Sequence, residues 1–183
     1  MSVQDKPETV YRVFPLPDTN LAKILSGSEY RQKFHANLKT WNPVIVFLYR
    51  IGLLPLLGIS KTVMLLITKG CKSGKTRYTP IGYFTIGGEK YLFSAWGRKT
   101  GWYRNLTANP GAVTILIGIK KHSVRPVEIT VPDIINQTLE KLIIESPEVA
   151  KYLFGWDPQT DQISQSDFSP IIERVLIMKF LPQ

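Results

Sequence analysis

Short apolar runs separated by tight turns dominate the chain after residue 61. Three of them are "TVMLLITK" at 62–69, "YTPIGYFTI" at 78–86 and "KYLFSAW" at 90–96, and Gly87-Gly88 between the last two is a hairpin signal. The remaining predicted strands lie at 112–119, 122–131 and 171–180. These runs follow one another too closely for the helical crossovers that a parallel sheet needs. We therefore predict a mainly β fold with helices, built on a six-stranded antiparallel barrel.

Helical patterns lie on both sides of the first strands. From Leu21 onward apolar residues recur at helical spacing, with Asn20 as the N-cap and a break at Gly27. Asn42-Pro43 predicts a restart of the helix, and Pro55 predicts its end. Further helices are predicted at 102–110 and from 132 onward, the latter interrupted at Ser146-Pro147 before the last strand.

The length of the chain predicts one domain. It has 183 residues, of which 44% are hydrophobic, enough to bury a full core. We expect an extended arm over 1–18, N-terminal helices over 19–60 and a barrel with inserted helices over 61–183.

Charge and cysteine content limit the partners and the compartment. Twenty-three Lys and Arg against fourteen Asp and Glu leave a net charge of +9, which favours phosphates, polycarboxylates or anionic lipid headgroups. Aromatic residues do not alternate along strands with basic neighbours, so we predict no nucleic-acid binding. The single Cys71 forms no internal disulfide and the start of the chain shows no signal pattern, so we expect a cytoplasmic protein.

The apolar run "PVIVFLYRIGLLPLLGI" at 43–59 is too short and too interrupted to span a bilayer. Two interpretations stay open for it. It forms a buried core helix, or it lies on a membrane surface and makes the protein membrane-associated.

A basic loop, "KGCKSGKTRYTP" at 69–80, follows the first strand. Gly70 and Gly74 permit a tight path, and Lys72, Lys75 and Arg77 can converge on one phosphate or carboxylate. The spacing is not that of a Walker loop, and no helix follows. For an isolated basic turn a solvated hairpin loop is the favoured interpretation, and composition alone leaves the question open.

A second cluster, "SAWGRKTGWYRNLTANP", covers 94–110. A strand ends at Ser94, glycines frame Arg98 and Lys99, and Trp102 begins a helix whose N-terminus favours anions. Core packing explains the aromatic pair in this stretch, but it explains the intervening cations and glycines less well.

Three motifs in order carry a resemblance to a known family. They are G-x-K-S-G-x-x-R-x-x-P at 70–80, S-A-x-G at 94–97 and W-Y-x-N-L-x-A-N-P at 102–110. Over about 42–131 the chain resembles the deazaflavin-dependent nitroreductase family. The resemblance implies a split β-barrel related to proteins that bind flavin mononucleotide (FMN), and it implies coenzyme F420 as the cofactor.

By position, the resemblance assigns residues to the coenzyme. The phosphate and γ-glutamate tail would contact Lys72, Ser73, Gly74, Lys75 and Arg77. The ring system would lie beside Thr79, Pro80, Ser94, Ala95, Trp96 and Gly97, with Trp102, Tyr103 and Asn105 closing one side.

The resemblance also implies the chemistry, in which a reduced deazaflavin delivers a hydride while the protein orients the ring and excludes water. No dedicated catalytic base is required, and we assign no catalytic residue. The sequence shows no Cys/His metal spacing, so we predict no metal site.

Two departures from the family pattern bear on the tail contacts and on the acceptor. Relatives commonly carry an arginine where this chain has Cys71, and Lys75 is the residue that would compensate. Only Tyr152 is retained where some relatives place several tyrosines over the substrate, which puts a quinone or an enone beside a nitroaromatic compound as acceptor. The residues expected to wall the substrate are Tyr103, Tyr152 and Trp156.

The sequence leaves two alternative functions open: an FMN-binding oxidoreductase on the same barrel, and a non-catalytic carrier of a cofactor or lipid. It also leaves open whether the protein forms a homodimer.

Overall fold

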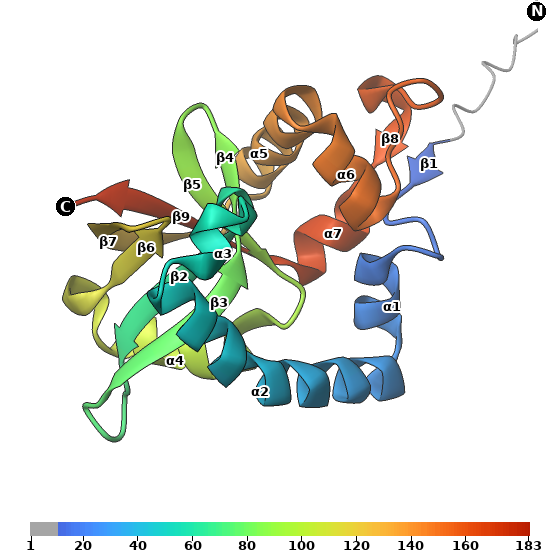
Figure 1. Cartoon of the computed structure of the whole chain (residues 1–183). Helices are drawn as coiled ribbons and strands as arrows, with labels where there is room; N and C mark the ends of the chain where they lie inside the picture. Colours follow the sequence, from blue (N-terminus) through green and yellow to red (C-terminus); the bar gives the residue numbers. More distant parts are fainter. Residues whose placement is uncertain (1–10) are drawn as a thin grey trace, which may run out of the picture.

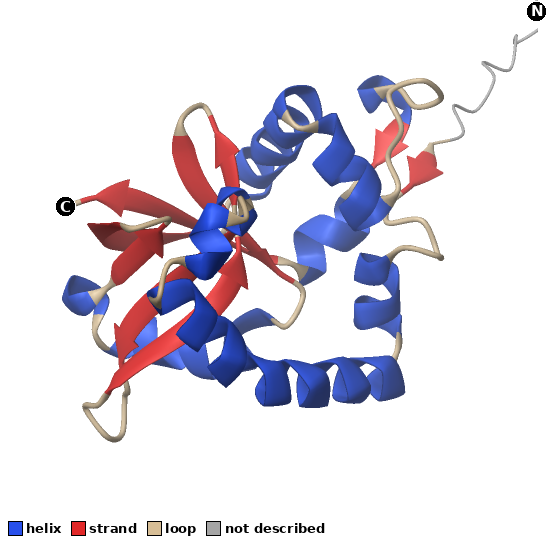
Figure 2. Cartoon of the chain, viewed as in Figure 1, coloured by secondary structure: helices blue, strands red, loops and turns tan. Residues whose placement is uncertain are grey.

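A seven-stranded antiparallel sheet forms the centre of the computed structural model, which describes residues 11–183. Figure 2 shows its strands in red, curled around one another with helices on several sides. The sheet strands are β2 (Val63–Lys69), β3 (Thr76–Gly82), β4 (Phe84–Ile86), β5 (Glu89–Ser94), β6 (Thr114–Ile117), β7 (Lys120–Ile129) and β9 (Leu176–Pro182). Their order is β3-β2-β6-β7-β9-β5-β4. The predicted mainly β antiparallel fold is confirmed.

The sheet has one more strand than predicted because the run 78–86 bends at Tyr83. The backbone N–H of Tyr83 donates to the carbonyl of Thr62 at 3.0 Å, and its hydroxyl donates to the carbonyl of Ser60 at 2.7 Å. These bonds turn the chain away from β2, and β4 then pairs with β5 instead. The two edge strands, β3 and β4, are therefore consecutive in the chain, as in a barrel that curls back toward its own edge.

The N-terminal helices are α1 (Asn20–Ser26), α2 (Ser28–Arg50), α3 (Leu53–Leu56) and the 3₁₀ turn η1 (Ile59–Lys61). The break at Gly27 is confirmed, but three details were wrong. Thr19, not Asn20, is the N-cap, and its hydroxyl accepts from the N–H of Ala22. Helix α2 continues through Pro43, although a proline removes one N–H donor from the helix interior. It ends at Arg50, two residues before Gly52, whose φ of 83° suits glycine, while Pro55 lies inside α3.

The remaining helices are α4 (Gly101–Ala108), α5 (Pro132–Glu145), α6 (Pro147–Phe154) and α7 (Ser169–Arg174), with 3₁₀ turns η2 (Gly97–Lys99), η3 (Pro110–Ala112) and η4 (Ile163–Gln165). The interruption at Ser146-Pro147 is confirmed. The predicted strand 171–180 was wrong in its first half. Pro170 opens α7 there, and Ile171 packs into the core, so β9 begins only at Leu176.

Part of the predicted extended arm lies in a small second sheet. β1 (Arg12–Val13) pairs in parallel with β8 (Ser166–Asp167). The first ten residues of the arm lie outside the described part of the chain.

Three clusters of buried side chains hold these elements together. The first lies inside the curled sheet, with residues from β2, β5, β6, β7, β9 and α4. The second lies between the sheet and α5, α6 and α7, and it includes Phe14 next to β1. The third lies under α2 and α3, where Tyr49 and Leu54 pack on Leu65 and Leu116. Figure 1 shows α5, α6 and α7 on one side of the sheet and α2 along another.

Candidate functional site

The basic loop lies at the turn between β2 and β3, and two glycines shape it. The N–H of Gly74 donates to the carbonyl of Gly70 at 2.8 Å, and the N–H of Gly70 donates to the carbonyl of Lys75 at 2.9 Å. Gly74 has a φ of 63°, and a Cβ on Gly70 would lie only 2.8 Å from the hydroxyl of Ser73. The glycines therefore close the turn through their own N–H groups.

The loop leaves other donors available to a ligand. Among the described residues, the backbone N–H groups of Lys72 and Ser73 have no hydrogen-bond partner. The side chains of Lys72, Lys75 and Arg77 are exposed, and within the described part of the chain none forms an ion pair. Adjacent free N–H groups beside uncompensated cations are the donor set that binds phosphate and carboxylate groups.

Helix α4 fixes the loop in place. The carboxamide oxygen of Asn105 accepts from the backbone N–H of Cys71 at 3.0 Å, and the carboxamide nitrogen of Asn109 donates to the carbonyl of Lys69 at 3.5 Å. The motif asparagines thus position the loop through its backbone. Because the contact at Cys71 uses only the main chain, an arginine at this position would make the same hydrogen bond. The predicted Asn105 is therefore a loop-positioning residue in this structure.

The segment 94–97 leads into the N-terminus of the same helix. Ser94 is buried and pairs with Leu176 in the sheet, and Gly97 follows Ala95 and Trp96 with a φ of 63°. The predicted ring neighbours Thr79 and Pro80 are half-buried on β3. A hollow of about 220 Å³ adjoins Gly97, and its walls include Arg98 and Glu128. The structure therefore connects the second motif to α4 and to this hollow.

Tyr103 takes part in a charged cluster that the sequence did not predict. Its hydroxyl donates to one carboxylate oxygen of Glu128 at 2.6 Å, while Arg98 pairs with the other oxygen. The hydrogen bond to this carboxylate, followed by burial, raises the pKa of Tyr103. The Tyr103 hydroxyl is therefore held protonated and directed at β7. Trp102 contacts the Tyr103 ring edge to face, with centroids 6.0 Å apart.

Thr68, next to the loop on β2, was also missed. It is 1% exposed, and among the described residues its hydroxyl has no hydrogen-bond partner. Along the strand it shares a face with Met64 and Leu66, which line the interior of the curled sheet. A threonine inside an apolar strand resembles any β-branched residue in sequence, so only burial identifies this polar atom.

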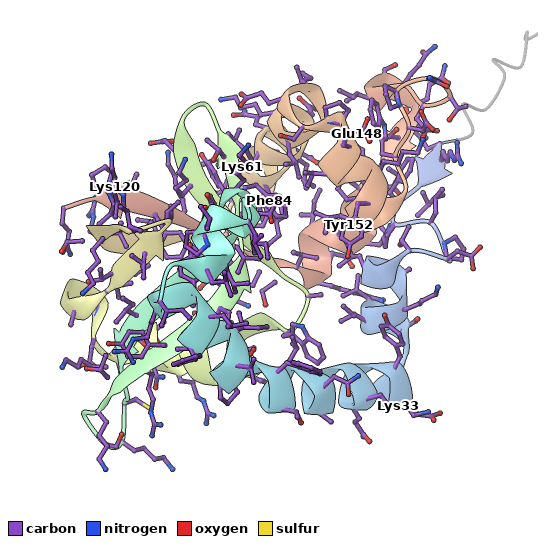
Figure 3. The ribbon with its side chains drawn as sticks, in the orientation of Figure 1. Lys33, Lys61, Phe84, Lys120, Glu148 and Tyr152 are labelled. Carbon is purple, nitrogen blue, oxygen red and sulfur yellow. The ribbon has the colours of Figure 1, made fainter. Side chains whose placement is uncertain are left out.

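The other two predicted wall residues lie elsewhere. Tyr152 is exposed on α6, and Figure 3 places it far across the view from the β2–β3 turn. Trp156 is buried in the cluster between the sheet and α5 to α7, and its indole N–H has no partner among the described residues. The structure thus places Tyr103 on α4, the helix that contacts the loop, and places Tyr152 and Trp156 on other elements.

Two features are absent from residues 11–183. No helix there is long and apolar enough to cross a membrane. No group of three or more His, Cys, Asp and Glu side chains in this part is arranged to hold a metal ion.

Comparisons with known proteins agree with this arrangement. The model of the F420H(2)-dependent quinone reductase family matches residues 55–158, which is 104 of the 183 residues. No curated protein matches the chain.

Solved structures show partial similarity. An F420-H2 dependent reductase (FDR-A) is 21% identical, with 66% of this chain and 94% of that chain covered and a TM-score of 0.43. A putative 5-nitroimidazole antibiotic resistance protein from Bacteroides thetaiotaomicron is 14% identical, with 68% and 75% covered and a TM-score of 0.48. A putative pyridoxamine 5'-phosphate oxidase from Listeria innocua is 14% identical, with 70% and 90% covered and a TM-score of 0.42.

The family match covers the basic loop, the 94–97 segment and α4, the three elements that the structure joins. The chain therefore belongs to the F420H2-dependent quinone reductase family, and it is an F420H2-dependent reductase whose cofactor is coenzyme F420.

Proposed function

We propose that this reductase transfers a hydride from F420H2 to a quinone or another flat, electron-poor acceptor, an enone or a nitroaromatic compound. The observation that carries the proposal is the β2–β3 loop. It combines exposed, unpaired cations with two free backbone N–H groups, and Asn105 fixes it against α4. This donor set fits the phosphodiester and carboxylate end of the coenzyme.

In this proposal the loop residues hold the anionic end. Lys72 and Arg77 contact the phosphate and the tail carboxylates, Ser73 donates its backbone N–H, and Lys75 adds positive charge. The turn is already closed by its own hydrogen bonds, so it does not have to be ordered on binding. That preorganisation supports tight binding by so small a loop.

The ring end of the coenzyme would lie along β3 and the 94–97 segment, beside Thr79, Pro80, Gly97 and Trp102. When bound, the reduced coenzyme supplies the hydride, so the protein itself needs no nucleophile. The chain's own residues orient the ring and exclude water. Half-buried Trp102 packs against the apolar interior of the sheet, and the Tyr103 hydroxyl stays protonated on Glu128.

Titration of the purified protein tests the assignment of the loop. The double variant Lys72→Ala/Arg77→Ala removes two charge-assisted contacts, so its Kd for oxidised F420 should rise about 100-fold or more. The control is Lys120→Ala/Lys121→Ala, an exposed basic pair at the start of β7, which should keep the original Kd. If both double variants bound F420 with the same Kd, the loop would not be part of the binding site.

A panel of acceptors tests the substrate class. We expect F420H2 oxidation with a soluble quinone, an enone and a nitroaromatic compound, with the largest kcat/KM for the quinone. A protein that binds F420 but reduces none of the three acceptors would contradict the proposal. That result would favour the alternative of a non-catalytic cofactor carrier. Parallel titration with FMN separates the remaining cofactor alternative, since tighter binding of FMN than of F420 would contradict the proposal.

A further inference from the structure

Glu128 joins two segments of the candidate site to the sheet. It lies on β7, and its side chain is 19% exposed. One carboxylate oxygen accepts a hydrogen bond from the Tyr103 hydroxyl at 2.6 Å, and the other pairs with Arg98. Tyr103 belongs to α4, whereas Arg98 belongs to η2, the turn that begins at Gly97. A single carboxylate therefore connects both segments to one strand.

Helix α4 depends on such contacts for its position. It has eight residues, and a helix of this length is not stable by itself. Among the described residues, Thr100 gives no side-chain cap to its N-terminus, and Leu106 is its one buried residue. On this helix Asn105 accepts a hydrogen bond from the N–H of Cys71 in the basic loop at 3.0 Å. The helix thus contacts both Glu128 and the basic loop, so a shift of α4 would move the loop as well.

Charge alone does not account for a carboxylate at this place. Between residues 30 and 127 the sequence contains one acidic residue, Glu89, so Glu128 adds a negative charge beside a basic region. A negative charge near the site would weaken the binding of an anionic coenzyme. Arg98 compensates this charge, and the hydrogen bond from Tyr103 is strong because its acceptor is ionised. The contacts of Glu128 therefore indicate a positioning role rather than an electrostatic one.

We propose that Glu128 is a positioning residue of the coenzyme site. Through Tyr103 and Arg98 it holds α4 and the 94–97 segment on the sheet, and α4 in turn holds the basic loop through Asn105. Glu128 acts through these partners and not by contact with the coenzyme. The inference rests on the proposed function only where it concerns F420 binding, because the position of the loop can be measured in the free protein.

Glu89 provides a matched comparison within the same chain. It accepts a hydrogen bond from the Tyr91 hydroxyl at 3.4 Å and pairs with Lys179, so it also lies between a tyrosine and a cation. These partners belong to β5 and β9, and not to α4 or the basic loop. Glutamine at either position, 89 or 128, removes one negative charge. A purely electrostatic effect would therefore tighten F420 binding slightly in both variants.

Titration with oxidised F420 tests the proposal by the sign of the change in Kd. Glu128→Gln should raise the Kd about tenfold, because it removes the ion pair with Arg98 and leaves Tyr103 with a neutral acceptor. Glu89→Gln should keep the original Kd or lower it slightly. A Kd for Glu128→Gln at or below that of Glu89→Gln would overturn the proposal.

Hydrogen exchange of the free protein, measured by NMR, tests the same role without coenzyme. The N–H of Cys71 donates to Asn105, so its exchange rate reports whether α4 still holds the loop. Glu128→Gln and Tyr103→Phe should both speed this exchange at least about threefold, whereas Glu89→Gln should not. Amides in the middle of β2 should exchange at the original rate in all three variants, which shows that the fold is intact. Unchanged exchange at Cys71 in Glu128→Gln would contradict the proposal.

Together the two measurements separate failure of this inference from failure of the proposed function. Weaker F420 binding and faster exchange at Cys71 in Glu128→Gln would support the positioning role. If Lys72→Ala/Arg77→Ala left F420 binding unchanged, the loop would not hold the coenzyme, but exchange at Cys71 would still decide the role of Glu128. If that double variant lost binding while Glu128→Gln kept the original Kd and exchange rate, only the positioning role would be overturned.

Discussion

Helices α2 and α5 have similar apolar patterns but opposite surroundings. Helix α5 buries five residues of one side against the sheet, Ile135, Thr138, Leu139, Leu142 and Ile143. In α2 only Tyr49 is buried among the side chains that the structure describes, and the largest apolar residues point away from the protein. Burial of one side is what normally stabilises an amphipathic helix. The comparison indicates that α5 stabilises the fold through its buried side, whereas the corresponding apolar side of α2 is left exposed.

The N-terminal and C-terminal parts of the chain also differ in charge. The segment from residue 30 to residue 88 has nine basic residues and no acidic one, whereas the segment from Glu128 to the C-terminus has nine acidic residues and four basic ones. The basic β2–β3 loop lies in the first segment. Positive charge is thus concentrated in the segment that contains this loop, and acidic residues are concentrated toward the C-terminus.

The largest expected difference comes from removing one leucine in each region. Leu139→Ala, at a fully buried position on α5, should lower the free energy of unfolding by about 2–5 kcal/mol, because it leaves a cavity. Leu56→Ala on α3 should change it by less than about 0.5 kcal/mol. Urea unfolding measures both. Similar losses would mean that the exposed Leu56 does support the fold.

Substitution of Tyr49 should have an intermediate effect on the free energy of unfolding, because this residue attaches α2 to the sheet. Its hydroxyl lies 3.1 Å from the carbonyls of Val63 and Leu116, and it accepts from the N–H of Gly118 at 3.1 Å. Burial raises the pKa of this phenol, so it stays protonated.

Tyr49→Phe should therefore cost about 1–3 kcal/mol in the free energy of unfolding, since it leaves buried polar groups without a partner. Tyr152→Phe, at an exposed position on α6, is the matched control and should leave stability unchanged. A neutral result for Tyr49→Phe would show that apolar packing alone attaches α2.

Lowering the pH should destabilise the C-terminal region first. This effect on stability should be smaller than those of the leucine and Tyr49 substitutions. The ion pair with Lys151 lowers the pKa of Asp157, and hydrogen bonds from Ser169 lower that of Asp167. A lowered pKa in the folded state stabilises the fold above the ordinary pKa of about 4, and this contribution disappears as the pH falls further. No carboxylate lies between residues 30 and 88 to respond.

Hydrogen exchange between pH 5 and pH 2, corrected for its intrinsic pH dependence, compares the regions. Protection of α6 and α7 should fall before that of β2 and β3. The variant Asp157→Asn/Asp167→Asn should flatten the dependence of stability on pH in this range. If α6 and α7 lost protection at the same pH as β2 and β3, the two regions would not differ in their response to acid.

Much of the fold was predictable from local signals. Gly87 and Gly88 both have positive φ at the β4–β5 turn, and Ser146-Pro147 interrupts the last helices as predicted. Local signals failed where tertiary contacts override them. Pro43 looks like a helix boundary but lies inside α2, and Ile171 and Ile172 look like strand residues but lie in a helix.

The site was predictable in composition and less so in geometry. The motifs identified the loop, Asn105 and Tyr103 as belonging together. They did not indicate that Asn105 bonds the backbone of Cys71, or that Glu128 holds Tyr103, because these partners are 34 and 25 residues apart. Tyr152 and Trp156 remain predictions as wall residues, and the structure places them away from the loop.

By itself, the sequence determined the antiparallel strands, the glycine turns and the excess of positive charge, since all three depend on local conformation or composition. Only the tertiary structure decided which side of each helix is covered. Periodicity places apolar residues on one side of a helix, but it does not say whether another element of the chain packs there. For α5 the sheet does, and for α2 and α3 the apolar side is left exposed.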